Sequence, residues 1–378
     1  MSIGDISLGL KTLKVTYHNR EVGTLALTVD GKVAFSYSAD WLECGFSISP
    51  FSLPLEQKVF VPHKNHFQGL YGVFADSLPD AWGNLLVERI LREHRIKGNI
   101  TVIDRLAMVG KSGMGALEYE PNYDVTEDKV LDDLDYLSKQ CKKILNTEFS
   151  PELDTLYKMG GSSGGARPKI LTEINGKDWM IKFPAHVDSD EIGAQEYAYS
   201  KCAKECGIVM SETKLFPSSV CSGYFGTERF DLMREGNEKK KVHVITAAGL
   251  LEADYQSPCL DYHDLMKLTH IITRGNKEDL ENMFRRACFN VFAHNRDDHA
   301  KNFSFLYEEE KDGWRLSPAY DLTYSNTYWG EHTTSVDGNG KNPGEQQLLN
   351  VGVRAGISKK KCFEIIEQIR EKTKILKM

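Results

Sequence analysis

The feature that most constrains this chain of 378 residues is a polar loop at residues 294–302, which reads His-Asn-Arg-Asp-Asp-His-Ala-Lys-Asn. The loop carries an aspartate, Asp297, and an asparagine five positions later, Asn302. A β-hairpin pattern follows at residues 303–316, because two short apolar runs flank an Asp-Gly turn. A second aspartate, Asp321, comes directly after this hairpin. The chain therefore presents a carboxylate, an amide, a hairpin and a second carboxylate in that order.

Protein-kinase folds present a catalytic base, a metal-binding amide and a metal-binding acid in the same order. Phosphoryl transfer needs a base near the acceptor hydroxyl and Mg²⁺ across the phosphates. The pattern predicts that Asp297 is the base and that Asn302 and Asp321 ligate Mg²⁺, which prefers oxygen ligands. His299 and Lys301 would steady the γ-phosphate. The alternative is a polar loop with Asx turns, but so many functional groups between two apolar elements favour catalysis.

Composition and charge narrow the class of protein. The chain is 41% hydrophobic and 27% charged, which is typical of a soluble globular protein. Its net charge of −7 argues against nucleic-acid binding through the whole surface. No apolar run approaches the ~20 residues that span a bilayer, and the N-terminus lacks a secretory pattern. Eight cysteines are scattered without a CxxC pair, so we expect a cytoplasmic protein with no membrane contact.

The first part of the chain is predicted to be a small α+β module. Alternating apolar residues predict strands at 15–17, 25–29 and 33–37, with a tight Asp-Gly hairpin between the last two. A helix is predicted at about 80–94. Helical spacing over residues 126–146 marks a boundary.

The second part reads as a small antiparallel sheet followed by helices. Strands at 170–174 and 179–183 flank an Asn-Gly turn, and a helix at 192–206 ends before a glycine. Two more strands are predicted near 214–216 and 224–230, and the pattern beyond Asp261 is helical. The predicted fold class is α+β, a two-lobed protein-kinase-like fold with an N-terminal accessory domain and a mostly helical C-terminal lobe. The predicted domains are the accessory domain, the N-lobe with its Gly-rich loop, and the helical C-lobe, at residues 1–122, 123–235 and 236–378.

A glycine-rich segment precedes the second hairpin. Residues 160–165 contain four glycines, and a backbone without Cβ can approach phosphate closely. Ser162 and Ser163 add hydroxyls, while Arg167 and Lys169 add positive charge. A flexible surface loop is the equally common alternative, and the spacing is not that of a Walker loop.

Two further sites are predicted by position. Ile181 and Phe183 share one face of a strand, so Lys182 points to the other, from which a kinase lysine reaches the phosphates. Glu196, on the next helix, is available to pair with Lys182. Residues 228–231 (Glu-Arg-Phe-Asp) end the last strand of the lobe, where a hinge would face adenine; an ordinary charged strand end is the alternative.

At these residues the chain resembles the HipA family, serine/threonine kinases that act as toxins in bacterial toxin–antitoxin modules. The resemblance covers almost the whole chain, since residues 15–37 and 72–83 resemble the family's N-terminal domain. Asn295 and His299 agree with HipA-like proteins and differ from ordinary protein kinases. Five kinase motifs match in order, at residues 162–169, 181–184, 228–231, 295–306 and 318–322.

The resemblance implies that Asp297 is the base and that Asn302 and Asp321 bind Mg²⁺. It also implies autophosphorylation of a serine in the Gly-rich loop, where Ser162 aligns best and Ser163 stays open. Phosphate there would add nearly two negative charges where ATP phosphates bind, and so switch the kinase off. The residues expected to hold ATP are Gly164, Gly165, Ala166, Arg167, Lys169, Lys182, Glu228, Arg229, Phe230, His299, Lys301 and Tyr320, with Glu196 as the supporting ion-pair partner.

The resemblance further implies partners. These are a dimeric, HipB-like helix-turn-helix antitoxin and a protein substrate such as an aminoacyl-tRNA synthetase. The sequence contains no helix-turn-helix of its own, so DNA contact is expected only through the antitoxin. Two other functions stay open: a non-catalytic corepressor bound to the antitoxin, and a small-molecule phosphotransferase of the aminoglycoside or choline type, which shares the base, the asparagine and the aspartate.

Overall fold

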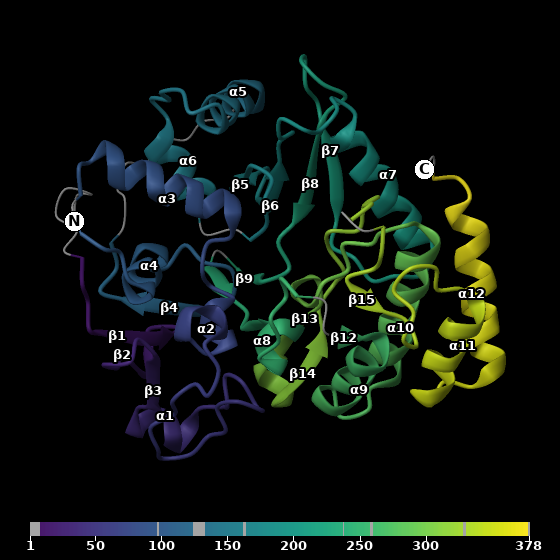
Figure 1. Cartoon of the computed structure of the whole chain (residues 1–378), viewed down its shortest axis with the longest axis horizontal. Coiled ribbons are helices and arrows are strands. Elements are labelled where there is room, and N and C mark those ends of the chain that lie inside the picture. The colour runs from purple at the N-terminus through teal and green to yellow at the C-terminus, as the bar shows by residue number, and fades with distance from the viewer. Residues whose placement is uncertain are drawn as a thin grey trace. The chain divides into compact units, whose positions relative to one another are not determined.

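A computed structural model describes most of the chain, and the described residues form an α+β protein (Figure 1). The chain divides into two compact units: unit 1 is Met1–Gly193 with Lys214–His243, and unit 2 is Ala194–Thr213 with Val244–Met378. The predicted three-domain division stays a prediction. The described residues are 8–96, 98–123, 133–161, 164–236, 238–257, 260–327 and 330–376.

Unit 1 begins with a four-stranded sheet in the order β3-β2-β1-β4, in which every pairing is antiparallel. The predicted hairpin at Asp30-Gly31 is confirmed, but the strand before it ends at Leu27 and not at Val29. The hydroxyl of Thr28 accepts the Lys32 N–H at 3.0 Å and closes the turn, so Val29 is left fully exposed. The strands are β1 (Thr12–Tyr17), β2 (Arg20–Leu27), β3 (Val33–Tyr37) and β4 (Leu117–Glu120).

Six helices accompany this sheet among the described residues of unit 1. The helix predicted at about 80–94 is confirmed as α3, which buries Trp82, Leu86 and Ile90. The helix predicted at 126–146 is found from Leu134 onward, and its first residues lie outside the described ones. The helices are α1 (Ala39–Cys44), α2 (Gly72–Ala75), α3 (Ala81–Glu93), α4 (Val102–Val109), α5 (Leu134–Leu145) and α6 (Leu153–Gly160).

The second sheet of unit 1 has the order β5-β6-β8-β7, and its β5–β6 and β6–β8 pairings are antiparallel, as the sequence predicts. Asn175 and Gly176 have φ of 53° and 75°, the positive values that an Asn-Gly hairpin turn requires. The strands are β5 (Lys169–Ile174), β6 (Lys177–Lys182), β7 (Thr213–Phe216) and β8 (Tyr224–Glu228), followed by the hairpin β9 (Leu232–Glu235) and β10 (Glu238–Lys241).

A buried histidine makes the stability of unit 1 depend on pH. Burial lowers the pKa of His243 to about 4, and its Nε2 lies 2.8 Å from the Ile48 carbonyl oxygen. The unfolded chain binds a proton at an ordinary pKa of about 6.5, so the folded state is progressively weakened as the pH falls from 6.5 to 4, by up to about 3 kcal/mol. Urea unfolding of the wild type and of His243→Gln at several pH values measures this. Gln does not titrate, so the variant is expected to lose less stability in acid, and equal losses would contradict the expectation.

Unit 2 is rich in helices, as predicted. α10 lies at its centre and contacts α9, α11 and α12 (Figure 1). Gly352 allows α11 to approach α12 closely, because a Cβ at this position would lie 2.5 Å from the Cys362 sulfur on α12. The helices are α7 (Ile192–Glu205), α8 (Ala247–Leu251), α9 (Tyr262–Ile272), α10 (Lys277–Phe292), α11 (Glu345–Arg354) and α12 (Lys359–Thr373).

Unit 2 also contains short strands, and β13 directly follows the loop that carries Asp297 in the chain. A three-stranded antiparallel sheet has the order β11-β13-β14, and β12 pairs with β15 in parallel. Asp312, at the turn of the predicted hairpin, has a φ of 44°. Within the described part of the chain, no helix has both the length and the apolar character to cross a membrane. The strands are β11 (Val244–Thr246), β12 (Leu260–Asp261), β13 (Ser304–Glu308), β14 (Gly313–Leu316) and β15 (Thr334–Ser335).

Candidate active site

The loop after α10 holds two adjacent aspartates in opposite environments. The side chain of Asp297 is 60% exposed, whereas that of Asp298 is fully buried. The side-chain amide of Asn302 donates to the carbonyl oxygen of Asp297 at 2.7 Å and closes the loop. The amide nitrogen is therefore committed to the backbone, and the amide oxygen is the group that can ligate a cation.

The loop of the second aspartate is hydrogen-bonded to this first loop on two sides. The Tyr320 hydroxyl donates to the Lys301 carbonyl oxygen at 2.7 Å and also bonds the Ser304 hydroxyl. The Asn295 side-chain amide lies 3.5 Å from the Asp321 carbonyl oxygen. The structure thus brings together the stretches that carry Asp297, Asn302 and Asp321.

Each of the two loops contains a residue in the left-handed backbone region. His294, just after α10, has a φ of 50°, and Asp321 has a φ of 53°. Such conformations are disfavoured for residues other than glycine, although aspartate and histidine adopt them more readily than most. The surrounding hydrogen bonds therefore hold both loops in conformations that short peptides rarely adopt.

A small aromatic and cationic cluster borders Asp297. The Nε2 of His299 lies 3.9 Å from the Asp297 carboxylate, and the Tyr255 ring lies 5.7 Å from the His299 ring. The Lys301 ammonium sits 4.6 Å from the centre of the Tyr255 ring. His299 and Lys301 were predicted site residues. Tyr255 was not, because nothing in its local sequence marks it.

Three buried polar atoms of the loop have no hydrogen-bond partner among the described residues. They are Oδ1 of Asn295, Nε of Arg296 and Nδ1 of His299. Buried polar groups are nearly always satisfied, so these atoms fit a site that binds water or a polar ligand.

The donor set at this site fits Mg²⁺ with nucleotide phosphates. Asn302 and Asp321 would supply an amide oxygen and a carboxylate, which are the hard ligands that this ion prefers. The described residues contain no group of three or more His, Cys, Asp or Glu side chains arranged to hold a metal. Mg²⁺ commonly takes only one or two protein carboxylate or amide ligands and completes its shell with phosphate oxygens and water.

The predicted Gly-rich loop lies in unit 1, and several of its polar groups are already engaged there. Lys169 is buried, and its ammonium donates to the Gly164 carbonyl oxygen. Arg167 makes a bidentate pair with Asp188, at 2.9 and 3.0 Å. Gly165 has a φ of 93°, and Ala166 is exposed. The predicted autophosphorylation sites, Ser162 and Ser163, lie outside the described residues.

The predicted strand lysine faces as expected. Ile181 and Phe183 are buried, whereas Lys182 is half-buried on the other face of β6, with its ammonium 5.7 Å from the Phe225 ring centre. Glu196 is buried in unit 2, while Lys182 belongs to unit 1, so their ion pair stays a prediction.

The predicted hinge residues have partners of their own in unit 1. Glu228 pairs with Lys177 at 3.2 Å, and Arg229 pairs with the buried Asp231 at 2.7 Å. Phe230, which lies between Arg229 and Asp231 in the sequence, is half-buried. The contact of these residues with ATP stays a prediction.

The start of α3 holds the Gly-rich loop, which the sequence did not suggest. The Asp80 carboxylate accepts the Gly165 N–H at 2.8 Å, and the Trp82 N–H donates to the Gly165 carbonyl oxygen at 3.4 Å. A Cβ at Gly83 would lie 2.0 Å from the Gly161 carbonyl oxygen. An aspartate before a helix usually caps that helix, but the Asp80 side chain makes no capping hydrogen bond, so its sequence position gave no signal of its contact with Gly165.

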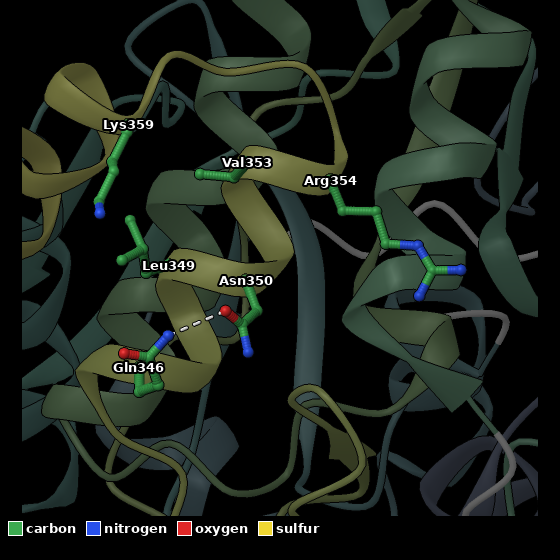
Figure 2. Close-up of a pocket in the computed structure, with 6 residues that line it drawn as sticks. All are labelled: Gln346, Leu349, Asn350, Val353, Arg354 and Lys359. Carbon is green, nitrogen blue, oxygen red and sulfur yellow. Dashed lines mark hydrogen bonds between the residues drawn. The ribbon is translucent and has the colours of Figure 1, made fainter.

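A shallow groove lies elsewhere in unit 2, on α11 and the first turn of α12 (Figure 2). The side chains of Gln346 and Asn350 are hydrogen-bonded along it at 2.9 Å. None of its lining residues is a predicted site residue. They are Gln346, Leu349, Asn350, Val353, Arg354 and Lys359.

Comparison with solved structures defines the fold class. A chain of the toxin–antitoxin complex of HipA, HipB and operator DNA from Shewanella oneidensis MR-1 matches with a TM-score of 0.70. The match has 18% sequence identity and covers 96% of this chain and 88% of that chain. The fold is therefore the α+β, kinase-like fold that the sequence predicts.

Two family matches then assign the chain. The family described as HipA-like C-terminal domain matches residues 161–375, and the HipA N-terminal domain family matches residues 13–120. The first match covers more than half of the chain, so this protein belongs to the HipA family. A curated relative from Sinorhizobium fredii, named "Putative kinase Y4dM", is 24% identical over 346 residues, which cover 86% of this chain and 80% of that protein.

Proposed function

We propose that this protein is an ATP-dependent serine/threonine protein kinase that acts as a HipA-type toxin. The observation that carries the proposal is the direct hydrogen bonding between the loop of Asp297 and Asn302 and the loop of Asp321. Membership of the HipA family supports it.

In this mechanism the exposed Asp297 carboxylate orients the acceptor hydroxyl and takes its proton as the new oxygen–phosphorus bond forms and the bond from the γ-phosphorus to the ADP leaving group breaks. Asn302 and Asp321 would hold Mg²⁺, which would neutralise charge on the phosphates. His299 lies beside the base and Lys301 lies over the Tyr255 ring, and both would offer N–H donors to the transferred group. Contact of the Gly-rich segment with the ATP phosphates is part of the proposal, as the family resemblance implies.

We further propose the regulation and partners that the family resemblance implies. Phosphate on Ser162 or Ser163 adds about −1.5 to −2 charge near the ATP phosphates and inactivates the enzyme. A HipB-like antitoxin dimer is the proposed partner and supplies the DNA contact; the solved complex of HipA, HipB and operator DNA supports this choice. An aminoacyl-tRNA synthetase is the proposed substrate.

Labelling tests the proposal directly. The purified full chain is incubated with γ-labelled ATP, Mg²⁺ and a bacterial lysate, and proteins and small molecules are separated. Label on this chain and on one lysate protein is the expected result. Label confined to a metabolite would favour the small-molecule phosphotransferase, because that enzyme shares the same base and metal ligands. No transferred label, together with retained operator repression, would favour the corepressor.

The contact between Asp80 and the Gly-rich loop predicts a change in ATP affinity. Asp80→Ala removes the acceptor of the Gly165 N–H, so the loop is less ordered in the free protein. Ordering it on nucleotide binding then costs affinity. We expect the KM for ATP to rise about fivefold to tenfold, the equivalent of one hydrogen bond, with kcat little changed. Glu88→Ala, an exposed acid further along α3, is the matched control. A KM equal to that of the control would show that Asp80 does not hold the loop.

A further inference from the structure

Asp298, the buried neighbour of the proposed base, ends a continuous path of hydrogen bonds through unit 2. Its carboxylate accepts from the Tyr262 hydroxyl at 2.8 Å and lies 2.9 Å from Nδ1 of His332. The backbone N–H of Thr334 donates to its second oxygen at 3.1 Å. Asp298 is fully buried, and both of its carboxylate oxygens already have hydrogen-bond partners. It therefore does not share the role of the exposed Asp297.

The path continues from Tyr262 toward the other loop. The Asn290 side-chain amide donates to the Tyr262 hydroxyl at 2.8 Å, and the Asn295 amide donates to Asn290 Oδ1 at 2.9 Å. Asn295 also lies 3.5 Å from the carbonyl oxygen of Asp321. All four members have 2% or less of their surface exposed. We call these residues the buried chain: Asp298, Tyr262, Asn290 and Asn295.

The buried chain has one consistent direction. Asn295 donates to Asn290, Asn290 donates to Tyr262, and Tyr262 donates to the Asp298 carboxylate. Hydrogen bonds in such a series polarise and strengthen one another away from water, and any unmade bond leaves a buried polar group unsatisfied. The chain therefore favours a single arrangement of its members over nearby alternatives.

Both end members of the buried chain, Asp298 and Asn295, lie on the loop of Asp297, and Asn295 also contacts the backbone of the loop of Asp321. One end is the residue that follows Asp297, and the other reaches the backbone of Asp321. The members come from α9, from α10 and from the loop itself, so the scaffold is two rigid helices. We propose that the buried chain is a positioning device that sets the proposed base relative to the proposed Mg²⁺ ligand. This inference rests on the proposed function for its catalytic consequence.

Tyr262→Phe tests the inference at the middle of the chain. The change removes one oxygen, keeps the ring that packs edge-on against Phe303, and separates Asn290 from Asp298. We expect kcat to fall about tenfold and the Mg²⁺ concentration for half-maximal rate to rise several-fold, with the KM for ATP changed less than twofold. Tyr307→Phe is the matched control, because it removes a hydroxyl that bonds Asp312 on the hairpin, outside the buried chain.

Hydrogen–deuterium exchange of the protein without nucleotide gives a readout that does not depend on activity. Faster exchange in both segments 294–302 and 318–322 of Tyr262→Phe, and in neither segment of the control, supports the inference. Unchanged exchange in segment 318–322 overturns it, and so does a kcat within twofold of the wild type. Asn290→Ala cuts the next link and is measured in the same way if Tyr262→Phe does not fold. A wild type without transferase activity would reject the proposed function, while the exchange data would still decide whether the chain couples the loops.

Discussion

Replacing Asp297 with asparagine is expected to lower the rate of phosphoryl transfer about a thousandfold, within the ~10²–10⁴ range of general-base contributions. Asparagine has nearly the same shape but does not accept the proton of the acceptor hydroxyl. The loop should survive, because Asn302 donates to the backbone carbonyl of residue 297 and not to its side chain. Initial rates at saturating ATP and Mg²⁺ measure kcat, and the KM for ATP should stay near that of the wild type.

Asp312→Asn is the control for this change. It makes the same chemical substitution in the hairpin turn, where asparagine tolerates the φ of 44°. It should keep full activity. If Asp297→Asn retains activity within about threefold of the control, Asp297 is not the base, because a base contributes at least ~10². Growth arrest gives a second readout: it should be lost in Asp297→Asn, and a corepressor would keep its repression.

The second large effect concerns stability. Asp231→Ala is expected to lower the free energy of unfolding by about 3–5 kcal/mol, the range for breaking a buried ion pair. Arg229 donates to Asp231 through Nε at 3.0 Å and Nη2 at 2.7 Å, and only 10% of the Arg229 side chain is exposed. The variant leaves this charge buried without its partner, and the Gly115 N–H loses its acceptor at 2.8 Å. Urea unfolding followed by tryptophan fluorescence measures the loss.

The pH dependence of this pair has a definite sign. Burial alone would raise the pKa of Asp231, but the charge and hydrogen bonds of Arg229 outweigh it, and the pKa lies below its usual 3.8. A carboxyl whose folded pKa is lowered contributes its full stability above the unfolded pKa and loses it as the pH falls through the folded value. The Asp231 contribution should therefore be constant at neutral pH and disappear only in strong acid.

A double variant distinguishes the effect of the ion pair on stability from the effect of lost side-chain packing. Arg229→Met with Asp231→Leu removes both charges and leaves no uncompensated ion, so it should recover most of the stability lost in Asp231→Ala. If Asp231→Ala lowers the free energy of unfolding by less than about 1 kcal/mol, the buried pair contributes little, because substitutions at ordinary surface sites change it by only ~0.5 kcal/mol. ATP binding by the double variant also tests whether Arg229 contacts nucleotide, as the family resemblance implies.

Local chemistry explains what the sequence predicted well. The Asn-Gly turn at 175–176 and the Asp-Gly turn at 30–31 were placed correctly, because Asn175, Gly176 and Gly31 adopt the positive φ that few other residue types tolerate. The helix at 80–94 was found within a residue at each end, since its apolar stripe has a clear helical period. The order of functional groups along the chain singled out the loop of Asp297, whose hydrogen bonding to the loop of Asp321 the structure shows, while its catalytic role stays a prediction.

Long-range partners explain what the sequence could not predict. Asp80 and Gly165 are 85 positions apart, and Tyr262 and Asp298 are 36 apart. No local pattern encodes such pairings, because they depend on how helices and loops meet after folding. The same limit applies to Arg229, whose position suggested a nucleotide hinge while its guanidinium is engaged by Asp231.

The glycine at position 83 has one further mechanical consequence. Since no side chain stands between α3 and the carbonyl of Gly161, the helix and the Gly-rich segment touch backbone to backbone, without flexible side chains to absorb movement. A small rotation or slide of α3 toward that segment would displace it by a similar distance. The N-terminal region and the Gly-rich segment of unit 1 are thus mechanically coupled at Gly83, in addition to the hydrogen bonds of Asp80 and Trp82.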